Sequence, residues 1–200
     1  STYTGDSSGG SGNIGHGLNA TPDFIIFKSR DVADNWAIYH SSMGLAYSEF
    51  TTSGFGGGNA TNRWSSLPTS SVIHLGGDTN VNTKNHLIYA WSAVEGYSSF
   101  GSYTGNGQHN NDQGPFIYTG FRPAFVMFKR TNSTGAWEMY DSTRSPENPY
   151  KLALVANTNG AEYNVGSYPA DMLSNGFKIR HSGANVNANG GNYVYMAFAE

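Results

Sequence analysis

The chain has 200 residues, only 12% of them charged, and a formal net charge of −3. Nucleic acid is excluded as a partner, because phosphate binding needs clustered lysine and arginine and no basic run occurs. The absence of cysteine excludes disulfides and thiolate metal sites, and no apolar run reaches the roughly 18 residues that membrane insertion requires.

Short runs of β-branched and aromatic residues predict strands along the whole chain. In the first half they cover residues 24–28, 36–41, 72–75 and 87–94. A run at 98–104 follows, and the second half adds 116–119, 124–130, 136–141, 152–155, 176–180 and 192–199. No window shows sustained helical periodicity, so almost no helix is expected.

The polarity of several runs predicts which face lies in the core. Phe177 and Ile179 alternate with Lys178 and Arg180, which indicates one buried and one solvated face. Trp137 and Met139 likewise share a face. Residues 193–198 are apolar on both faces, which predicts a central strand. The pair Asn175-Gly176 indicates a hairpin turn, because both residues tolerate positive φ.

Several motifs occur twice in the same order. The matched segments are 1–6 with 102–107, 20–30 with 121–130, 36–41 with 137–142, and Asn80-Val81-Asn82 with Asn185-Val186-Asn187. Such regular self-similarity predicts a tandem duplication, with a first β repeat over residues 1–101 and a second over 102–200. Residues present in both repeats are expected to form the scaffold. Residues present in only one repeat can serve a specific function such as ligand recognition.

The predicted fold is an all-β, concanavalin-like or jelly-roll sandwich made of two tandem-duplicated halves. No proline-rich or charged linker separates the repeats. One pseudo-symmetric sandwich is therefore favoured over two small independent domains. Because the chain begins inside a repeat motif, it is expected to be an excised piece of a longer protein.

Longer motifs cluster in the second half. They are residues 95–107 (EGYSSFGSYTGNG), the pattern Gly-Phe-x-Pro-x-Phe-Val-x-x-Lys at 120–129, Trp137, Asp141, Arg144, Asn148-Pro149, residues 175–178 and the ending 193–200. This set resembles a repeat family of tailed-phage virion proteins, found within long tail-fibre or tail-associated chains. The first half departs from the pattern, since Gly44 or Leu45 stands near the place of Arg144. The resemblance implies a virion location with other virion subunits as partners, and it transfers no catalytic residue.

Catalytic and metal signals are weak. The carboxylates are scattered singly, and Glu138 and Asp141 lie three residues apart, which places them on opposite faces of a strand. No catalytic residue is predicted. Asp78, Asn80 and Asn82 have the spacing of oxygen ligands in hard-cation loops. Their counterpart lacks a carboxylate, so no metal site is predicted, and calcium stays an alternative to turn hydrogen bonding.

The candidate ligand-binding residues are unmatched and lie in predicted loops. Because the matched aromatic residues are assigned to the core, the candidates are Trp64, Arg63, Asn59, Asn62, Tyr150 and Tyr168. Trp64 follows Arg63, and an exposed tryptophan beside an arginine is typical of a recognition anchor. The alternative is that Trp64 folds back onto the sandwich.

Three functions remain open. The first is a non-catalytic tail-fibre-type module that binds a host surface polysaccharide, with weak sites made effective by multivalency, for example in a homo-trimer. The second is a structural virion spacer or decoration domain without a ligand, which predicts that Trp64 is buried. The third is a polysaccharide depolymerase, which needs two carboxylates in one cleft.

Overall fold

The computed structural model describes residues 1–6, 10–56, 60–108, 113–164 and 170–200. It confirms an all-β chain, in which the helical elements of the described residues are the short α1 (Ala60–Arg63) and the 3-10 turns η1 (Ser41–Met43) and η2 (Gly77–Thr79). The chain divides into two compact units. Unit 1 comprises Ser1–Phe50 and Phe55–Ser92, and unit 2 comprises Thr51–Gly54 and Ala93–Glu200.

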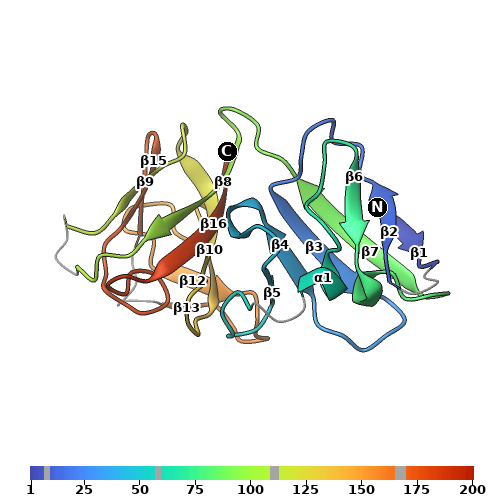
Figure 1. Cartoon of the computed structure of the whole chain (residues 1–200). Coiled ribbons are helices and arrows are strands. Elements are labelled where there is room, and N and C mark those ends of the chain that lie inside the picture. Colours follow the sequence, from blue (N-terminus) through green and yellow to red (C-terminus); the bar gives the residue numbers. More distant parts are fainter. Residues whose placement is uncertain (7–9, 57–59, 109–112, 165–169) are drawn as a thin grey trace. The chain divides into compact units, whose positions relative to one another are not determined.

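Unit 1 consists of two antiparallel sheets (Figure 1). The larger sheet has the order β1-β7-β3-β4-β5, with β1 (Thr2–Thr4), β7 (Asn85–Trp91), β3 (Phe24–Ser29), β4 (Ala37–His40) and β5 (Tyr47–Glu49). The smaller sheet pairs β2 (Gly12–Gly15) with β6 (Val72–Leu75). Side chains of both sheets meet in one hydrophobic cluster, which includes Ile25, Phe27, Ile73 and Ile88.

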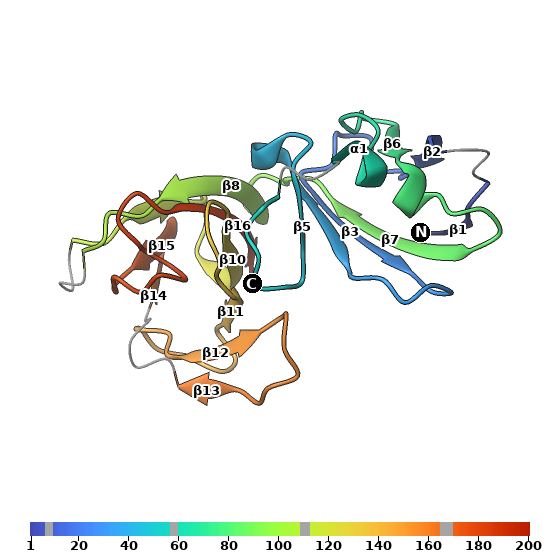
Figure 2. The same cartoon turned by 60° about the horizontal axis from the view of Figure 1, so that its bottom comes forward.

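Unit 2 repeats this plan with longer strands (Figure 2). The larger sheet has the order β13-β12-β11-β10-β16-β8, with β13 (Tyr163–Asn164), β12 (Leu152–Val155), β11 (Trp137–Asp141), β10 (Pro123–Arg130), β16 (Asn192–Ala199) and β8 (Ser98–Thr104). The smaller sheet has the order β14-β15-β9, with β14 (Ala170–Leu173), β15 (Gly176–Ile179) and β9 (Phe116–Tyr118). As the sequence predicts, β16 is a central strand.

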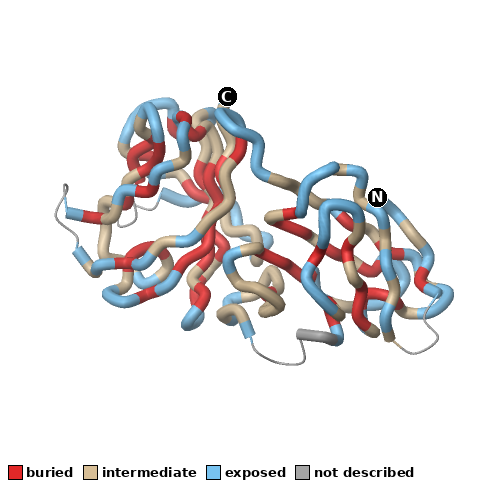
Figure 3. The backbone as a smooth tube through the Cα atoms, turned by 45° about the horizontal axis from the view of Figure 1, so that its top comes forward, coloured by how far each residue is buried: buried red, intermediate tan, exposed pale blue. Residues whose placement is uncertain are grey.

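The core of unit 2 lies between its two sheets. Its buried cluster takes Ile117, Met172 and Phe177 from the small sheet, and Phe128 and Tyr195 from the large one. Figure 3 shows the buried residues concentrated on the middle strands. Each unit is thus a two-layer β-sandwich with its own hydrophobic cluster.

The matched sequence segments occupy corresponding places in the two large sheets. In unit 1, Leu87 pairs with both Thr2 and Lys28. In unit 2, Val194 pairs with both Ser102 and Lys129. Both lysines donate from Nζ to the carbonyl six residues later, Lys28 to Asp34 and Lys129 to Gly135. The two units therefore share strand order, register and a loop-fixing lysine.

The register corrects one of the sequence matches. Asn80 hydrogen-bonds the backbone N–H of Asp6, and Asn187 hydrogen-bonds that of Asn106. Asn80 therefore corresponds to Asn187 and not to Asn185. The second compact unit resumes at Ala93, before β8 begins.

Candidate functional site

The predicted anchor Trp64 lies in the core of unit 1. It is 1% exposed, forms a bridge with Leu75 and packs edge-on against Tyr39, with ring centroids 6.2 Å apart. The expectation of an exposed loop tryptophan is therefore wrong, and the folded-back alternative is the one observed. The physical reason is that β6 and α1 place residue 64 over the sheet, where its large ring fills the cluster.

Arg63 is also turned inward, because carboxylates surround its guanidinium. It is 7% exposed and donates two hydrogen bonds to Asp34 and one, of 3.1 Å, to Glu49. Nε lies 3.9 Å from Asp78, and the guanidinium covers the ring of Tyr47. The hydrogen bond from Arg63 lowers the pKa of Asp34, and the same bond raises the pKa of Arg63. The arginine anchors three segments of unit 1.

Of the remaining predicted residues, the structure describes Asn62 in unit 1 and Tyr150 in unit 2. Asn62 is exposed on α1. Tyr150 is 0% exposed, and its backbone exchanges hydrogen bonds with Ala170. This corrects the expectation for Tyr150, whose ring belongs to the core of unit 2. Asn59 and Tyr168 lie outside the described residues.

The calcium alternative rested on Asp78, Asn80 and Asn82. Asn80 is 2% exposed, and its amide exchanges hydrogen bonds with Asp6, accepting at 3.3 Å and donating at 2.9 Å. Asn80 is thus engaged by Asp6, and Asp78 lies 3.9 Å from Nε of Arg63. Within the described ranges, no group of three or more histidine or acidic side chains could hold a metal ion.

A different surface of unit 2 exposes aromatic rings on a regular strand. On β9, Ile117 enters the core, whereas Phe116 and Tyr118 point outward and are 46% and 67% exposed. The neighbouring strand β15 pairs Gly176 with Tyr118 and Lys178 with Phe116. Because side chains alternate along a strand, Lys178 lies on the same outer face as these rings. We call this outer surface of β9, β15 and β14 the β9 face.

Gly176 keeps the middle of the β9 face flat. A Cβ atom there would lie 2.1 Å from the carbonyl oxygen of Ile117 and 2.9 Å from the ring of Phe116. The ring of Phe116 therefore lies against the glycine backbone. A side chain at position 176 would displace the ring. The hairpin turn itself is formed by Ser174 and Asn175, which join Leu173 of β14 to Gly176 of β15.

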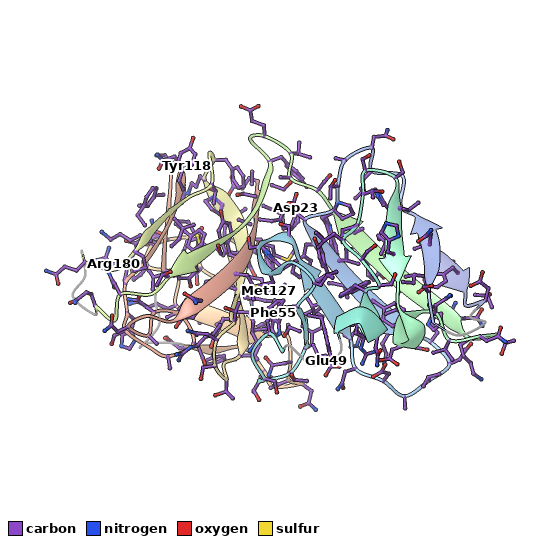
Figure 4. The ribbon with its side chains drawn as sticks, viewed as in Figure 1. Asp23, Glu49, Phe55, Tyr118, Met127 and Arg180 are labelled. Atoms are coloured by element: carbon purple, nitrogen blue, oxygen red, sulfur yellow. The ribbon has the colours of Figure 1, made fainter. Side chains whose placement is uncertain are left out.

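The other end of the β9 face is charged. Asp171 on β14 pairs with Lys178 in the sheet and forms an ion pair with Arg180. Its side chain is 8% exposed, and its Oδ1 is buried without a hydrogen-bond partner in the described part of the chain. Tyr118 and Arg180 lie toward opposite ends of β15 (Figure 4). The face thus combines aromatic rings with cationic donors.

Unit 1 carries none of these groups at the corresponding positions. Register places Asn13 where unit 2 has Phe116, Gly15 where it has Tyr118, and His74 where it has Lys178. Asn13 and His74 bond each other at 2.7 Å. The residues of 116–119 predict a strand, but their composition alone does not show which side chains face outward. The usable signal was the unmatched pair of rings flanking Ile117, since Asn13 and Gly15 occupy the corresponding positions of the first half.

The fold and the β9 face define a two-unit β-sandwich module with a solvent-exposed aromatic surface. The chain belongs to the family described as a domain of unknown function (DUF7483), whose model matches residues 1–200. No curated protein and no solved structure matches the chain. In the part of the chain that the structure describes, no helix has the length and hydropathy to cross a membrane.

Proposed function

We propose that this chain is a non-catalytic, tail-fibre-type virion module that binds a host cell-surface glycan through the β9 face. The observation that carries the proposal is the exposure of Phe116 and Tyr118 beside Lys178, Arg180 and Asp171 in unit 2 only. Residues of the β9 face, rather than the buried Trp64 and Tyr150, contact the ligand. As the sequence analysis expects, these residues have no match in the first half.

The groups of the β9 face suit a saccharide chemically. An aromatic ring offers a flat apolar face to the C–H surface of a pyranose. Lys178 and Arg180 supply donors for ring and hydroxyl oxygens, and Asp171 holds Arg180 through their ion pair. From residue 176 to residue 180, β15 and its continuation rise about 13 Å, enough for a short oligosaccharide.

A flat, open site binds weakly, because it buries little area and orders several side chains. Several copies in a homo-trimeric fibre would raise the overall affinity by avidity. Binding is therefore tested with a multimerised form of the chain on an array of bacterial polysaccharides. Wild type binds at least one of them, and Tyr118→Ala reduces the affinity about tenfold, consistent with the loss of a stacked ring.

The matched control is Tyr89→Ala, which removes another exposed tyrosine, on β7 of unit 1. It leaves binding unchanged. If the wild-type protein binds no polysaccharide on the array, or if Tyr118→Ala binds as tightly as wild type, the proposal is overturned.

A structural spacer or decoration domain is the second candidate, and a specific observation favours it. That hypothesis predicted a buried Trp64, and the residue is 1% exposed. A stable oligomer in light scattering, with no glycan bound, would support the spacer. The depolymerase has less support, because Asp34 and Glu49 share one arginine and Glu138 is fully buried. Release of reducing ends from a capsular polysaccharide by the protein would support the depolymerase hypothesis.

A further inference from the structure

Within unit 2, the segment Thr51–Gly54 lies against the loop that joins β10 to β11. The carbonyl of Thr52 accepts from Nζ of Lys129 at 3.1 Å and from the N–H of Gly135 at 2.8 Å. Gly54 also approaches closely, because a Cβ atom there would lie 2.6 Å from a backbone carbonyl oxygen of the same loop. The loop of unit 2 is therefore a seat for a short segment that presents a carbonyl and, two residues later, a glycine.

The chain contains an equivalent segment at residues 157–160. Glu49 ends β5 and Val155 ends β12, and each pairs with the residue that lies opposite a buried phenylalanine of the next strand. Residues 157–160 (Asn-Thr-Asn-Gly) therefore stand after β12 where residues 51–54 (Thr-Thr-Ser-Gly) stand after β5. The second threonine and the glycine of residues 51–54 recur at the same places in residues 157–160.

Unit 1 has an equivalent seat in the loop that joins β3 to β4. Lys28 donates to the carbonyl of Asp34, six residues further on, which is the spacing of the corresponding bond in unit 2. Both residues line an open pocket, and within the described residues the N–H of Asp34 has no acceptor. Trp36 is 38% exposed, whereas its counterpart Trp137 is 1% exposed. Unit 1 thus offers the two donors of the seat without the carbonyl that they hold in unit 2.

The threonine and the glycine of residues 157–160 are both exposed. In the described part of the chain, no group donates to the carbonyl of Thr158. Gly160 has no positive φ, and a Cβ atom added there would have the Thr158 hydroxyl as its nearest neighbour, 3.5 Å away. The fold of a single chain therefore does not require glycine at position 160, whereas the close approach of Gly54 does require it.

We infer that residues 157–160 of one copy of the chain dock on the β3–β4 loop of a second copy. The carbonyl of Thr158 accepts from Lys28 Nζ and from the Asp34 N–H, since a lysine ammonium has three hydrogens to donate. Gly160 then lies against the loop as Gly54 does in unit 2. Because the docking segment and the receiving loop are different surfaces, the contact is heterologous and joins copies head to tail, in a ring or a filament. The inference does not depend on glycan binding at the β9 face.

The first experiment is a cross-link between two single-cysteine variants, which the absence of native cysteine makes possible. Val32→Cys places a thiol on the receiving loop, and Asn159→Cys places one on the docking segment. The two variants are mixed and treated with a short bis-maleimide, and they form a cross-linked heterodimer. Each chain carries one cysteine, so the cross-link must join two copies. Leu67→Cys, at a position of unit 1 that is 51% exposed, replaces Val32→Cys as the control and gives only background yield.

Sedimentation velocity measures the same contact without a cross-linker. The sedimentation coefficient of wild type rises with protein concentration, because a contact this small gives weak, reversible association. Gly160→Ala weakens association about tenfold, since its Cβ atom would meet a backbone carbonyl of the receiving loop. The control Gly15→Ala, where the nearest atom is 3.9 Å away, associates like wild type. A wild type that stays monomeric at every concentration, or a cross-linking yield that Gly160→Ala leaves unchanged, would overturn the inference.

Discussion

Glu138 and Asn185 are joined by a hydrogen bond of 2.9 Å inside unit 2, from the Asn185 amide to Oε1 of the carboxylate. The hydroxyl of Tyr163 also donates to Glu138, at 2.9 Å to Oε2. Glu138 is 0% exposed, and this burial raises the pKa of its carboxyl group despite the donors. The carboxylate thus connects β11, β13 and the loop before β16.

The raised pKa of Glu138 makes unit 2 less stable as the pH rises. The unfolded carboxyl group loses its proton first, so the contribution to the free energy of unfolding is complete below the unfolded pKa. It is lost as the pH rises through the folded pKa. We expect Glu138→Gln to remove this decline in denaturant titrations across the acidic range. Glu147→Gln, at an exposed position, keeps the wild-type profile; identical profiles for all three proteins would contradict the assignment.

Lys129 has the opposite dependence on pH. It is 0% exposed, and burial lowers its pKa from 10.5 to about 8. Between these two values the unfolded state binds more protons, so the free energy of unfolding increases with pH. The full increase is on the order of 3 kcal/mol. Urea titrations from pH 8 to 10 measure it, and Lys129→Met flattens the slope; a slope unchanged in that variant would refute the assignment.

The side chain of Asn187 fixes the turn after β8. It accepts from the N–H of Asn106 at 2.8 Å and donates to Asn106 Oδ1 and to the carbonyl of Gln108. Because Asn187 is 0% exposed, Asn187→Ala leaves buried groups unpaired and costs about 2–3 kcal/mol of unfolding free energy. Chemical denaturation measures the loss. Asn189→Ala, at the exposed position two residues on, changes stability little.

Gly105 allows the chain to approach residue 188 closely. A Cβ atom at Gly105 would lie 2.4 Å from the carbonyl oxygen of Ala188, and Gly5 makes the same approach to Val81 in unit 1. Because the opposing atom is backbone, Gly105→Ala costs about 2–3 kcal/mol. Gly160→Ala serves as the control, since the nearest atom there is a threonine hydroxyl at 3.5 Å. Equal thermal stability of the two variants would contradict the expectation.

Trp64 distinguishes core from ligand surface. Trp64→Ala removes a buried ring and destabilises unit 1 by about 3–5 kcal/mol. Tyr118→Ala, at a side chain that is 67% exposed, leaves the unfolding free energy within about 0.5 kcal/mol of wild type. Differential scanning calorimetry compares the two. A stable, fully folded Trp64→Ala variant would place the ring outside the core.

The sequence predicted the strands whose own residues favour the β conformation. The alternation of Phe177 and Ile179 with Lys178, and the apolar run of β16, appear in the structure as expected. It did not predict β2, whose sequence is Gly-Asn-Ile-Gly, because that strand depends on pairing with β6 rather than on propensity. Strands of two or three residues, such as β13 and β5, were missed for the same reason.

The candidate site was harder to predict than the fold. Trp64 and Phe116 are both large and apolar, and only tertiary packing decides that one is 1% and the other 46% exposed. Its place in a predicted loop suggested that Trp64 is exposed. Phe116 is exposed because its side chain lies on the outer face of β9. The useful signal was the comparison of the two halves. By strand register, Asn13 and Gly15 occupy in unit 1 the positions that Phe116 and Tyr118 occupy in unit 2.

The path of the chain limits how the protein can be divided. Thr51–Gly54 belongs to unit 2, although unit 1 supplies the residues on either side. The carbonyl of Thr52 accepts from Lys129 Nζ at 3.1 Å and from the N–H of Gly135 at 2.8 Å. A gene fragment that starts at Ala93 therefore lacks residues 51–54, and with them the carbonyl that accepts from Lys129 and Gly135.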